Sequence, residues 1–273
     1  MIRSLLLSLA LATSLVATAS ADTLVASWNM LHLGSKSKDE ASMIRIVSSF
    51  DLVAAQEVMN IEAVEALRVG LSASTGEVWN AAASLKTGRH SYKEHYAFFW
   101  RQDAIYSASD PLMYEDPGDL FERNPFSMRF VDKDGFAFVF AQIHSIYGKT
   151  RDRREAEART IAEYYQWLQR RYPETPVIMV GDFNLPPTNP AWKAMAGVAR
   201  PLITEGATTL STKEGQFANL YDNIWVPLSS ARYGLAIETS GIYEFPADIG
   251  VTHEEARKSI SDHAPVFAVI TTE

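Results

Sequence analysis

An apolar run in the second half of the chain ends at a carboxylate and an amide, Asp182 and Asn184. The run predicts a buried strand, and side chains two positions apart along a strand point the same way. We therefore expect Asp182 and Asn184 to emerge side by side at the carboxyl end of that strand. Carboxylate and amide oxygens are ligands that suit a hard metal ion.

The same arrangement recurs at the ends of other apolar runs. Polar side chains follow such runs at Asn29, Glu57 and His144. Two further groups lie beside the last two runs, at Asp222 and in the Ser-Asp-His sequence at 261–263. A packed sheet assembles a single site from polar groups at the ends of several strands. The pattern therefore predicts an oxygen-rich metal site with two histidines beside it.

Four of these residues offer hard oxygen ligands, namely Asn29, Glu57, Asp182 and Asp262. Such ligands suit Mg²⁺, Mn²⁺ or Ca²⁺. Because Mg²⁺ commonly keeps coordination positions for water and phosphate, this set suits catalysis better than a closed structural cage. Each residue alone also fits an ordinary helix cap or turn. The joint pattern favours the metal site.

His144 and His263 are the candidate acid and base, because an imidazole can take a proton from water or give one to a leaving oxygen near neutral pH. Each needs a carboxylate to hold its tautomer, and Glu94 and Asp222 lie at the edges of predicted strands. A buried structural histidine is the competing interpretation for His144. The remaining histidines are expected on loops or at the surface without a role: His32, His90, His95 and His253.

Composition limits what the protein can be. The chain has 273 residues, a formal net charge of −8 and no cysteine. Disulfides, thiolate catalysis and cysteine-ligated zinc are therefore excluded. The negative charge argues against a protein that binds nucleic acid by bulk electrostatics. It leaves open an enzyme that meets phosphates through a metal ion and a few local cations, because the local field need not follow the net charge.

The N-terminus has the pattern of a secretory signal peptide. Arg3 precedes an apolar stretch over 5–16, and the small residues that end at Ala21 fit a cleavage site before Asp22. The apolar stretch is too short to span a membrane. We expect residues 1–21 to be removed and the mature protein to be secreted or periplasmic. An uncleaved N-terminal anchor is the competing interpretation.

The mature chain, 22–273, shows no internal repeat, low-complexity tract or linker. Its length suits one large domain with a full core. We expect a single catalytic domain that is monomeric and has no stable association with a membrane.

Short β-branched and aromatic runs alternate with a few amphipathic helices. Strands are predicted over 23–29, 52–57, 78–84, 95–101, 104–109, 126–131, 136–144, 177–182, 221–226 and 265–271. Helices are predicted over 38–49, 60–70 and 152–171. Strands outnumber helices, and many neighbours have the pattern of hairpins. This favours an α+β fold, an α/β sandwich of two mixed sheets with helices outside, over a doubly wound parallel sheet.

Four cations open the last of these helices: Lys149, Arg151, Arg153 and Arg154. They are candidates to meet substrate phosphates. A solvated helix start, in which Glu155 and Glu157 pair with them along the helix, explains them equally well.

Five short motifs together resemble the endonuclease/exonuclease/phosphatase superfamily, and within it the secreted deoxyribonuclease I branch. They are QEV at 56–58, SYKEHY at 91–96, GDFN at 181–184, YD at 221–222 and ISDH at 260–263. The similarity covers essentially the whole mature chain. The Tyr-Lys-Glu segment distinguishes this branch from the other branches better than the shared GDFN does.

The resemblance implies a four-layer α/β sandwich and metal-dependent cleavage of DNA phosphodiester bonds with low sequence specificity. It implies that Glu57 anchors the divalent ion, Mg²⁺ or Mn²⁺, with the other three oxygen ligands around it. It also pairs His144 with Glu94, and His263 with Asp222, as the acid and base groups.

The family's substrate positions fall on three further residues. Asn184 matches the residue that binds the scissile phosphate, and Tyr92 and Arg123 match positions that touch DNA. The family also places a minor-groove arginine two residues after its metal glutamate, where this chain has Met59. Duplex DNA is the expected substrate, and single strands and RNA stay open because of Met59.

Relatives in this family carry structural calcium in the loop before that arginine. Asp116, Asp119 and the carbonyl group of Phe121 match the loop, which is shorter here and lacks the family's disulfide. The resemblance therefore implies a Ca²⁺ site, structural or co-activating.

Two other functions compete with a deoxyribonuclease. One is a phosphoesterase of the same superfamily that acts on RNA, a small phosphodiester or a lipid phosphate. A lipid-directed enzyme should show an exposed aromatic hairpin, whereas Trp79 and Trp100 lie in runs typical of a core. The other is a non-enzymatic binding protein, which should have lost a metal ligand or a histidine; here all are present.

Overall fold

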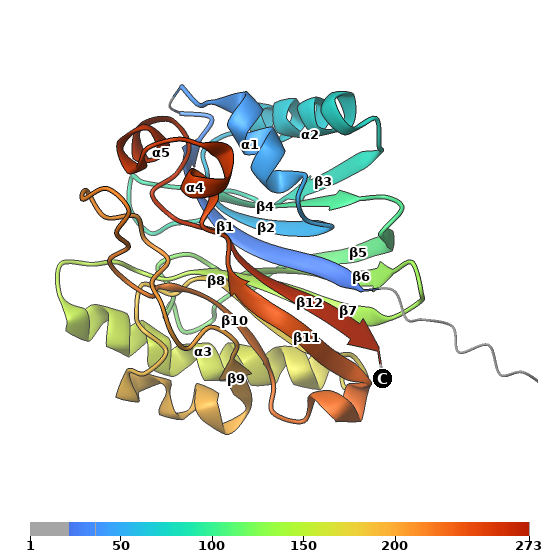
Figure 1. The fold of residues 1–273 in the computed structure, drawn as a ribbon. Helices are drawn as coiled ribbons and strands as arrows, with labels where there is room; N and C mark the ends of the chain where they lie inside the picture. The colour runs from blue at the N-terminus through green and yellow to red at the C-terminus, as the bar shows by residue number, and fades with distance from the viewer. Residues whose placement is uncertain (1–21, 36, 273) are drawn as a thin grey trace, which may run out of the picture.

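The computed structural model describes residues 22–35 and 37–272, so the expected signal peptide lies outside the described residues. Two six-stranded mixed sheets pack face to face, and helices cover both outer faces (Figure 1). This four-layer arrangement confirms the α/β sandwich expected from the sequence. In the described ranges, no helix is long and apolar enough to cross a membrane.

Each sheet contains one parallel pair of strands, β1 with β2 and β7 with β8, among antiparallel pairs. The first sheet has the order β11-β12-β1-β2-β4-β3. Its strands are β1 (Thr23–Leu33), β2 (Leu52–Val58), β3 (Trp79–Ala83), β4 (His95–Arg101), β11 (Leu235–Ile242) and β12 (Val266–Thr272). The second sheet has the order β5-β6-β7-β8-β10-β9. Its strands are β5 (Ile105–Met113), β6 (Phe126–Asp132), β7 (Ala137–His144), β8 (Val177–Asp182), β9 (Ala199–Pro201) and β10 (Asp222–Pro227).

Helices form the two outer layers. The first sheet is covered by α1 (Glu40–Val47), α2 (Ile61–Thr75), α4 (Phe245–Ile249) and α5 (His253–Ser259). The second sheet is covered by the long α3 (Arg151–Arg171) and by the 3₁₀ turns Pro190–Lys193 and Met195–Gly197. A third 3₁₀ turn, Ser230–Tyr233, precedes β11.

The apolar runs are continuous because the central strands are buried on both faces. On β7, Phe138 and Phe140 point into the core between the sheets, whereas Val139 and Ala141 pack under α3. The two expected core tryptophans, Trp79 and Trp100, are buried, as the sequence indicated. The period of two along each strand therefore separates a central core from two outer ones.

A buried polar contact joins the two sheets beneath one edge of the sandwich. Gln56 Nε2 on β2 donates to Gln142 Oε1 on β7 at 2.9 Å, and Gln142 Nε2 donates to the carbonyl of Ala97 at 2.8 Å. Both glutamines are fully buried. Because a buried amide without a partner is costly, this contact favours one register between the sheets. Glu57 is the next residue after Gln56, and His144 lies two residues after Gln142.

The predicted elements match the observed ones except near the C-terminus. The strands β9 and β11 and the helices α4 and α5 were not predicted. Their sequences are short or polar, and β11 lies at the edge of its sheet with Glu238, Thr239 and Ser240 in its middle. Helix α2 runs past its predicted end to Thr75, and Gly76 then closes it with a φ of 74°.

Gly181 allows the close approach of β7 and β8 just before Asp182. Its φ is 142°, a value that side chains other than glycine rarely adopt. A Cβ at this position would lie 1.8 Å from the carbonyl oxygen of Ile143. The glycine in the Gly-Asp-Phe-Asn motif is therefore required by packing and not by chemistry.

We expect Gly181→Ala to lower the free energy of unfolding by about 2–5 kcal/mol, through backbone strain and overpacking. Gly197→Ala is the matched control, because a Cβ there meets nothing within 4 Å. The control should change stability by less than about 1 kcal/mol. Denaturant unfolding followed by circular dichroism measures both. Equal midpoints for the two variants would show that the strands can move apart at Gly181.

Candidate active site

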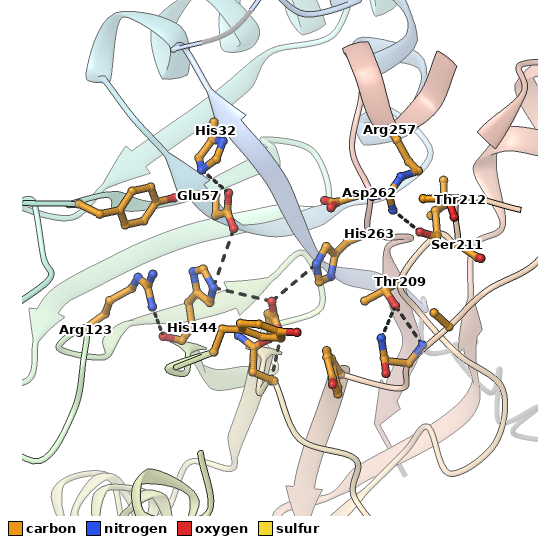
Figure 2. A pocket seen from close by; sticks show the side chains of 18 residues that line it. His32, Glu57, Arg123, His144, Thr209, Ser211, Thr212, Arg257, Asp262 and His263 are labelled. Carbon is orange, nitrogen blue, oxygen red and sulfur yellow. Dashed lines mark hydrogen bonds and ion pairs between the residues drawn. The ribbon is translucent and has the colours of Figure 1, made fainter. Parts of the chain in front are cut away.

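A pocket of about 560 Å³ opens at the edge of the sandwich where the polar strand ends meet (Figure 2). It is lined by residues of both sheets, by the segment 209–219 and by α5. Of the residues expected in the site, the lining includes Glu57, Tyr92, Arg123, His144, Asp182, Asn184, Asp262 and His263. Residues that lie far apart in the sequence are thus gathered around one cavity.

His144 forms the first histidine–carboxylate pair. Its Nδ1 lies 2.6 Å from Oε1 of the fully buried Glu94, and Arg123 Nε lies 3.0 Å from the other oxygen of Glu94. Burial would raise the pKa of Glu94, but the charges of His144 and Arg123 lower it below its usual range. Burial and Arg123 lower the pKa of His144, and Glu94 with Asp182 outweighs them, so its pKa is raised. The carboxylate therefore stays ionised and holds the ring with Nε2 toward the pocket.

His263 forms the second pair, with the fully buried Asp222. Its Nδ1 lies 2.8 Å from Asp222 Oδ2. Burial lowers the pKa of His263, but Asp222 and Asp182 outweigh burial and raise it to about 10. Ser261 fixes the backbone here, since its hydroxyl accepts from His263 N and donates to the carbonyl of Asn29.

Asp182 lies between the two imidazoles. Its Oδ2 is 3.7 Å from His144 Nε2 and 3.8 Å from His263 Nε2, and dashed lines in Figure 2 mark both contacts. Burial and the charge of Asp222 raise the pKa of Asp182, and together they outweigh the two histidines, which lower it. The free ring nitrogens therefore face one buried carboxylate from opposite sides.

Glu57 lies on the other side of His144, at the end of β2. It has a φ of 57°, a strained value for a residue with a side chain. Its Oε1 accepts from Asn29 Nδ2 at 3.1 Å and lies 4.0 Å from His144 Nε2. His32 Nε2 lies 3.2 Å from Glu57 Oε2, so His32 belongs to the site. From the sequence alone, His32 was expected to have no role.

The oxygen ligands around Glu57 and Asp182 fit a divalent cation. Asn29 Nδ2 donates to Glu57 and, at 3.2 Å, to Asp182, so the two carboxylates lie close together. Oε2 of Glu57 is buried and accepts no well-directed hydrogen bond. A hard cation would offset the repulsion between the carboxylates and give that oxygen a partner besides His32. Asn29 itself turns its oxygen away, to the N–H of Leu31, and so orients the carboxylates.

A second group of possible metal ligands lies beside the first. One oxygen or nitrogen from each of Asp182, Asp222 and His263 falls within 4.8 Å of the others. Asp222 and His263 already bond to each other, so Glu57 and Asp182 are the better pair for a cation. Asp262 lines the pocket, and its backbone carbonyl accepts from Leu210 N.

Three residues expected to contact substrate surround the histidines. Asn184 has a φ of 51°, and its amide donates to the carbonyl of Ser145 at 2.9 Å. The Arg123 guanidinium lies over the Tyr92 ring, 5.4 Å from its centroid. Arg123 also donates to the carbonyl of His144, so this cation joins the first histidine pair to the wall of the pocket.

The residues expected to bind calcium have other partners. Asp116 Oδ2 accepts from Phe121 N at 2.8 Å, and Asp119 pairs with Arg89 at 3.0 Å. Both aspartates have a φ of 48°. The loop is thus closed by its own hydrogen bonds, and calcium binding there stays a prediction.

Two histidines expected on loops or at the surface are buried. His95 lies at the start of β4 and bonds to the carbonyl of Ser84, and His253 lies at the start of α5. The sequence also gave no sign that 209–219 would form a wall of the pocket. A bridge between Thr209 and His263 places it there.

The pattern of the Endonuclease/Exonuclease/phosphatase family matches residues 26–263. A protein named "Deoxyribonuclease" from Thioalkalivibrio sp. is 42% identical, over 93% of this chain and 73% of its own length. "Deoxyribonuclease-1" of Bos taurus is 27% identical, over 90% and 92% of the two chains.

Solved structures share the fold at lower identity. A mannosyl-6-phosphatase of Bacteroides thetaiotaomicron has a TM-score of 0.63 at 19% identity and covers 91% of this chain and 99% of its own. D. rerio TDP2 complexed with single strand DNA product has a TM-score of 0.62 at 15% identity and covers 92% and 100%. With the match over 26–263, these similarities confirm the expected resemblance: the chain belongs to the endonuclease/exonuclease/phosphatase family of phosphoesterases.

Proposed function

We propose that the protein is a secreted, divalent-metal-dependent endonuclease that hydrolyses DNA phosphodiester bonds with low sequence specificity. The observation that carries the proposal is the pair of imidazoles that face Asp182, each held by its own buried carboxylate. The relatives named deoxyribonuclease match this chain over about nine-tenths of its length, which favours DNA among the possible phosphoesters.

The two histidines take different roles because their neighbours differ. The pKa of both histidines is raised, but at His144 the charge of Arg123 acts with burial against the rise, and no arginine does so at His263. On this difference we assign His144 as the base that takes a proton from the attacking water. At His263 burial is outweighed by three carboxylates, Asp222, Asp182 and Asp262, whose charges raise its pKa to about 10 and favour the protonated form near neutral pH. His263 gives its proton to the sugar oxygen that leaves as the bond from phosphorus to that oxygen breaks.

Glu57 and Asp182 would hold the cation, Mg²⁺ or Mn²⁺, and Asn29 would orient them. When bound, the cation supplies charge that stabilises the phosphate oxygens in the transition state. Asn184 would bind the scissile phosphate beside it, and Arg123 and Tyr92 would contact the strand on the side of His144.

Cleavage of supercoiled plasmid by the mature protein from Asp22 tests the proposal. We expect nicked circles to accumulate with Mg²⁺ or Mn²⁺ and to be absent with EDTA, because the carboxylates need the cation. RNA, a small phosphodiester and a lipid phosphate are assayed in parallel. Activity on one of these and none on DNA would replace the proposed substrate.

We expect His144→Ala and His263→Ala each to lower the cleavage rate by at least about two orders of magnitude, the usual contribution of a positioned acid or base. His90→Ala is the control, because the His90 side chain is 68% exposed. Thermal melting of each variant checks that the fold is retained. Nicking at the wild-type rate by a folded variant would remove that histidine from the mechanism.

We expect Glu57→Gln to weaken Mn²⁺ binding, measured by titration calorimetry, by at least about tenfold, since it removes one of two carboxylates from a hard-cation site. Glu65→Gln is the control, because Glu65 is exposed and pairs with Arg68 on α2. An unaltered affinity in Glu57→Gln would show that the cation is held elsewhere, for example by Asp222.

A further inference from the structure

The cations that open α3 do not share one environment. Arg151 Nε pairs with Glu155 at 2.9 Å along the helix, and its side chain is 64% exposed. Arg154 instead bonds to two residues that line the pocket, since its Nη1 lies 3.1 Å from the Tyr221 hydroxyl and 3.3 Å from the carbonyl of Asn184. The structure thus separates the two cations: Arg151 belongs to a solvated helix start, and Arg154 lies directly behind the wall of the pocket.

Arg154 is fixed in place without being neutralised. Its guanidinium lies over the ring of Tyr147, 5.1 Å from the centroid, and both of its hydrogen-bond acceptors are uncharged. Within the described residues it forms no ion pair with a carboxylate, and its Nε is buried without a hydrogen-bond partner. A preorganised arginine with unused charge and donor capacity is suited to binding an anion such as a phosphate.

Tyr147 completes this corner of the pocket. Its side chain lines the cavity, yet 63% of the residue is exposed. An exposed aromatic ring beside a cation offers a surface on which a base or sugar can pack, and such stacking does not depend on sequence. Arg154 therefore offers a positive charge for a phosphate, and Tyr147 offers a ring surface for a base or sugar, as a subsite for a nucleic-acid strand requires.

We propose that Arg154 and Tyr147 form a strand-binding subsite next to the catalytic centre. Arg154 binds the phosphate adjacent to the scissile one on the same strand, and Tyr147 packs against the nucleotide between them. The inference rests on the proposed nuclease function and on Asn184 as the contact of the scissile phosphate, because Arg154 bonds to the backbone of Asn184.

The subsite matters only for a substrate that has more than one phosphate. The test therefore compares an oligonucleotide with bis(4-nitrophenyl) phosphate, which carries a single phosphodiester. We expect Arg154→Gln to lower kcat/KM for DNA about tenfold more than for the small ester, through KM. In a plot of the logarithm of DNA affinity against the logarithm of salt concentration, the slope for Arg154→Gln should be smaller in magnitude than the wild-type slope by about one unit.

Matched variants separate charge from shape. Arg151→Gln makes the same charge change on the same helix and should keep the wild-type salt slope. Arg154→Lys keeps the charge and should restore most of the slope. Tyr147→Ser should raise KM for DNA with little change in slope, because it removes a ring and no charge.

The outcomes distinguish the subsite from the proposed function. Cleavage of DNA with the same salt slope in wild type and Arg154→Gln would overturn the subsite alone. An equal loss on both substrates in Arg154→Gln would also overturn it, and would make Arg154 a support for Asn184 and Tyr221. Hydrolysis of the small ester with no cleavage of DNA by the wild-type protein would overturn the nuclease function, and the subsite with it.

Discussion

The hydrogen bond between Gln56 and Gln142 sets the position of the two sheets on which the whole site depends. Both histidine–carboxylate pairs above it also cross from one sheet to the other. Glu94 precedes β4 of the first sheet and holds His144 on β7 of the second, whereas Asp222 on β10 holds His263 before β12. Asn29 on β1 likewise reaches Asp182 on β8. A shift of one sheet over the other would separate all of these pairs at once.

Electrostatics explains why the buried carboxylates come in this arrangement. Glu94 is neutralised by a histidine and an arginine, and Asp222 by a histidine. Glu57 and Asp182 share an amide donor, Asn29, and therefore lie close enough to repel each other, although each also contacts two histidines. A cation at this place would offset that repulsion, and so would stabilise the fold as well as serve the chemistry.

The sequence predicted those parts of the molecule that follow from local pattern. The strands of both sheets were predicted from apolar runs of period two. The residues His144, Asp182 and His263 were predicted from the polar side chains beside those runs. The sequence could not predict whether the side-chain oxygen or the side-chain nitrogen of Asn29 faces the carboxylates. The N–H of Leu31 decides this, because it donates to the Asn29 oxygen. The prediction missed β11 because an edge strand need not be apolar.

The roles of other residues could not be predicted from the sequence, because their positions depend on contacts with residues distant in the chain. His32 lies near the end of β1, and both Leu31 and His32 have a positive φ, a path that a strand pattern does not indicate. Arg154 and Arg151 lie in the same basic segment at the start of α3, and the positions of Tyr221 and Tyr147 on the folded protein give Arg154 its different partners. Long-range packing therefore decides what these residues do.

The contacts that cross between the sheets also bear on how the protein gains and loses activity. Neither sheet carries both members of the His144–Glu94 pair or of the His263–Asp222 pair, so a chain in which only one sheet has formed has neither pair. Both pairs need the two sheets to be docked with the central core closed. For a protein with no cysteine, which cannot lock this docking with a disulfide, activity then reports the integrity of the interface between its two halves.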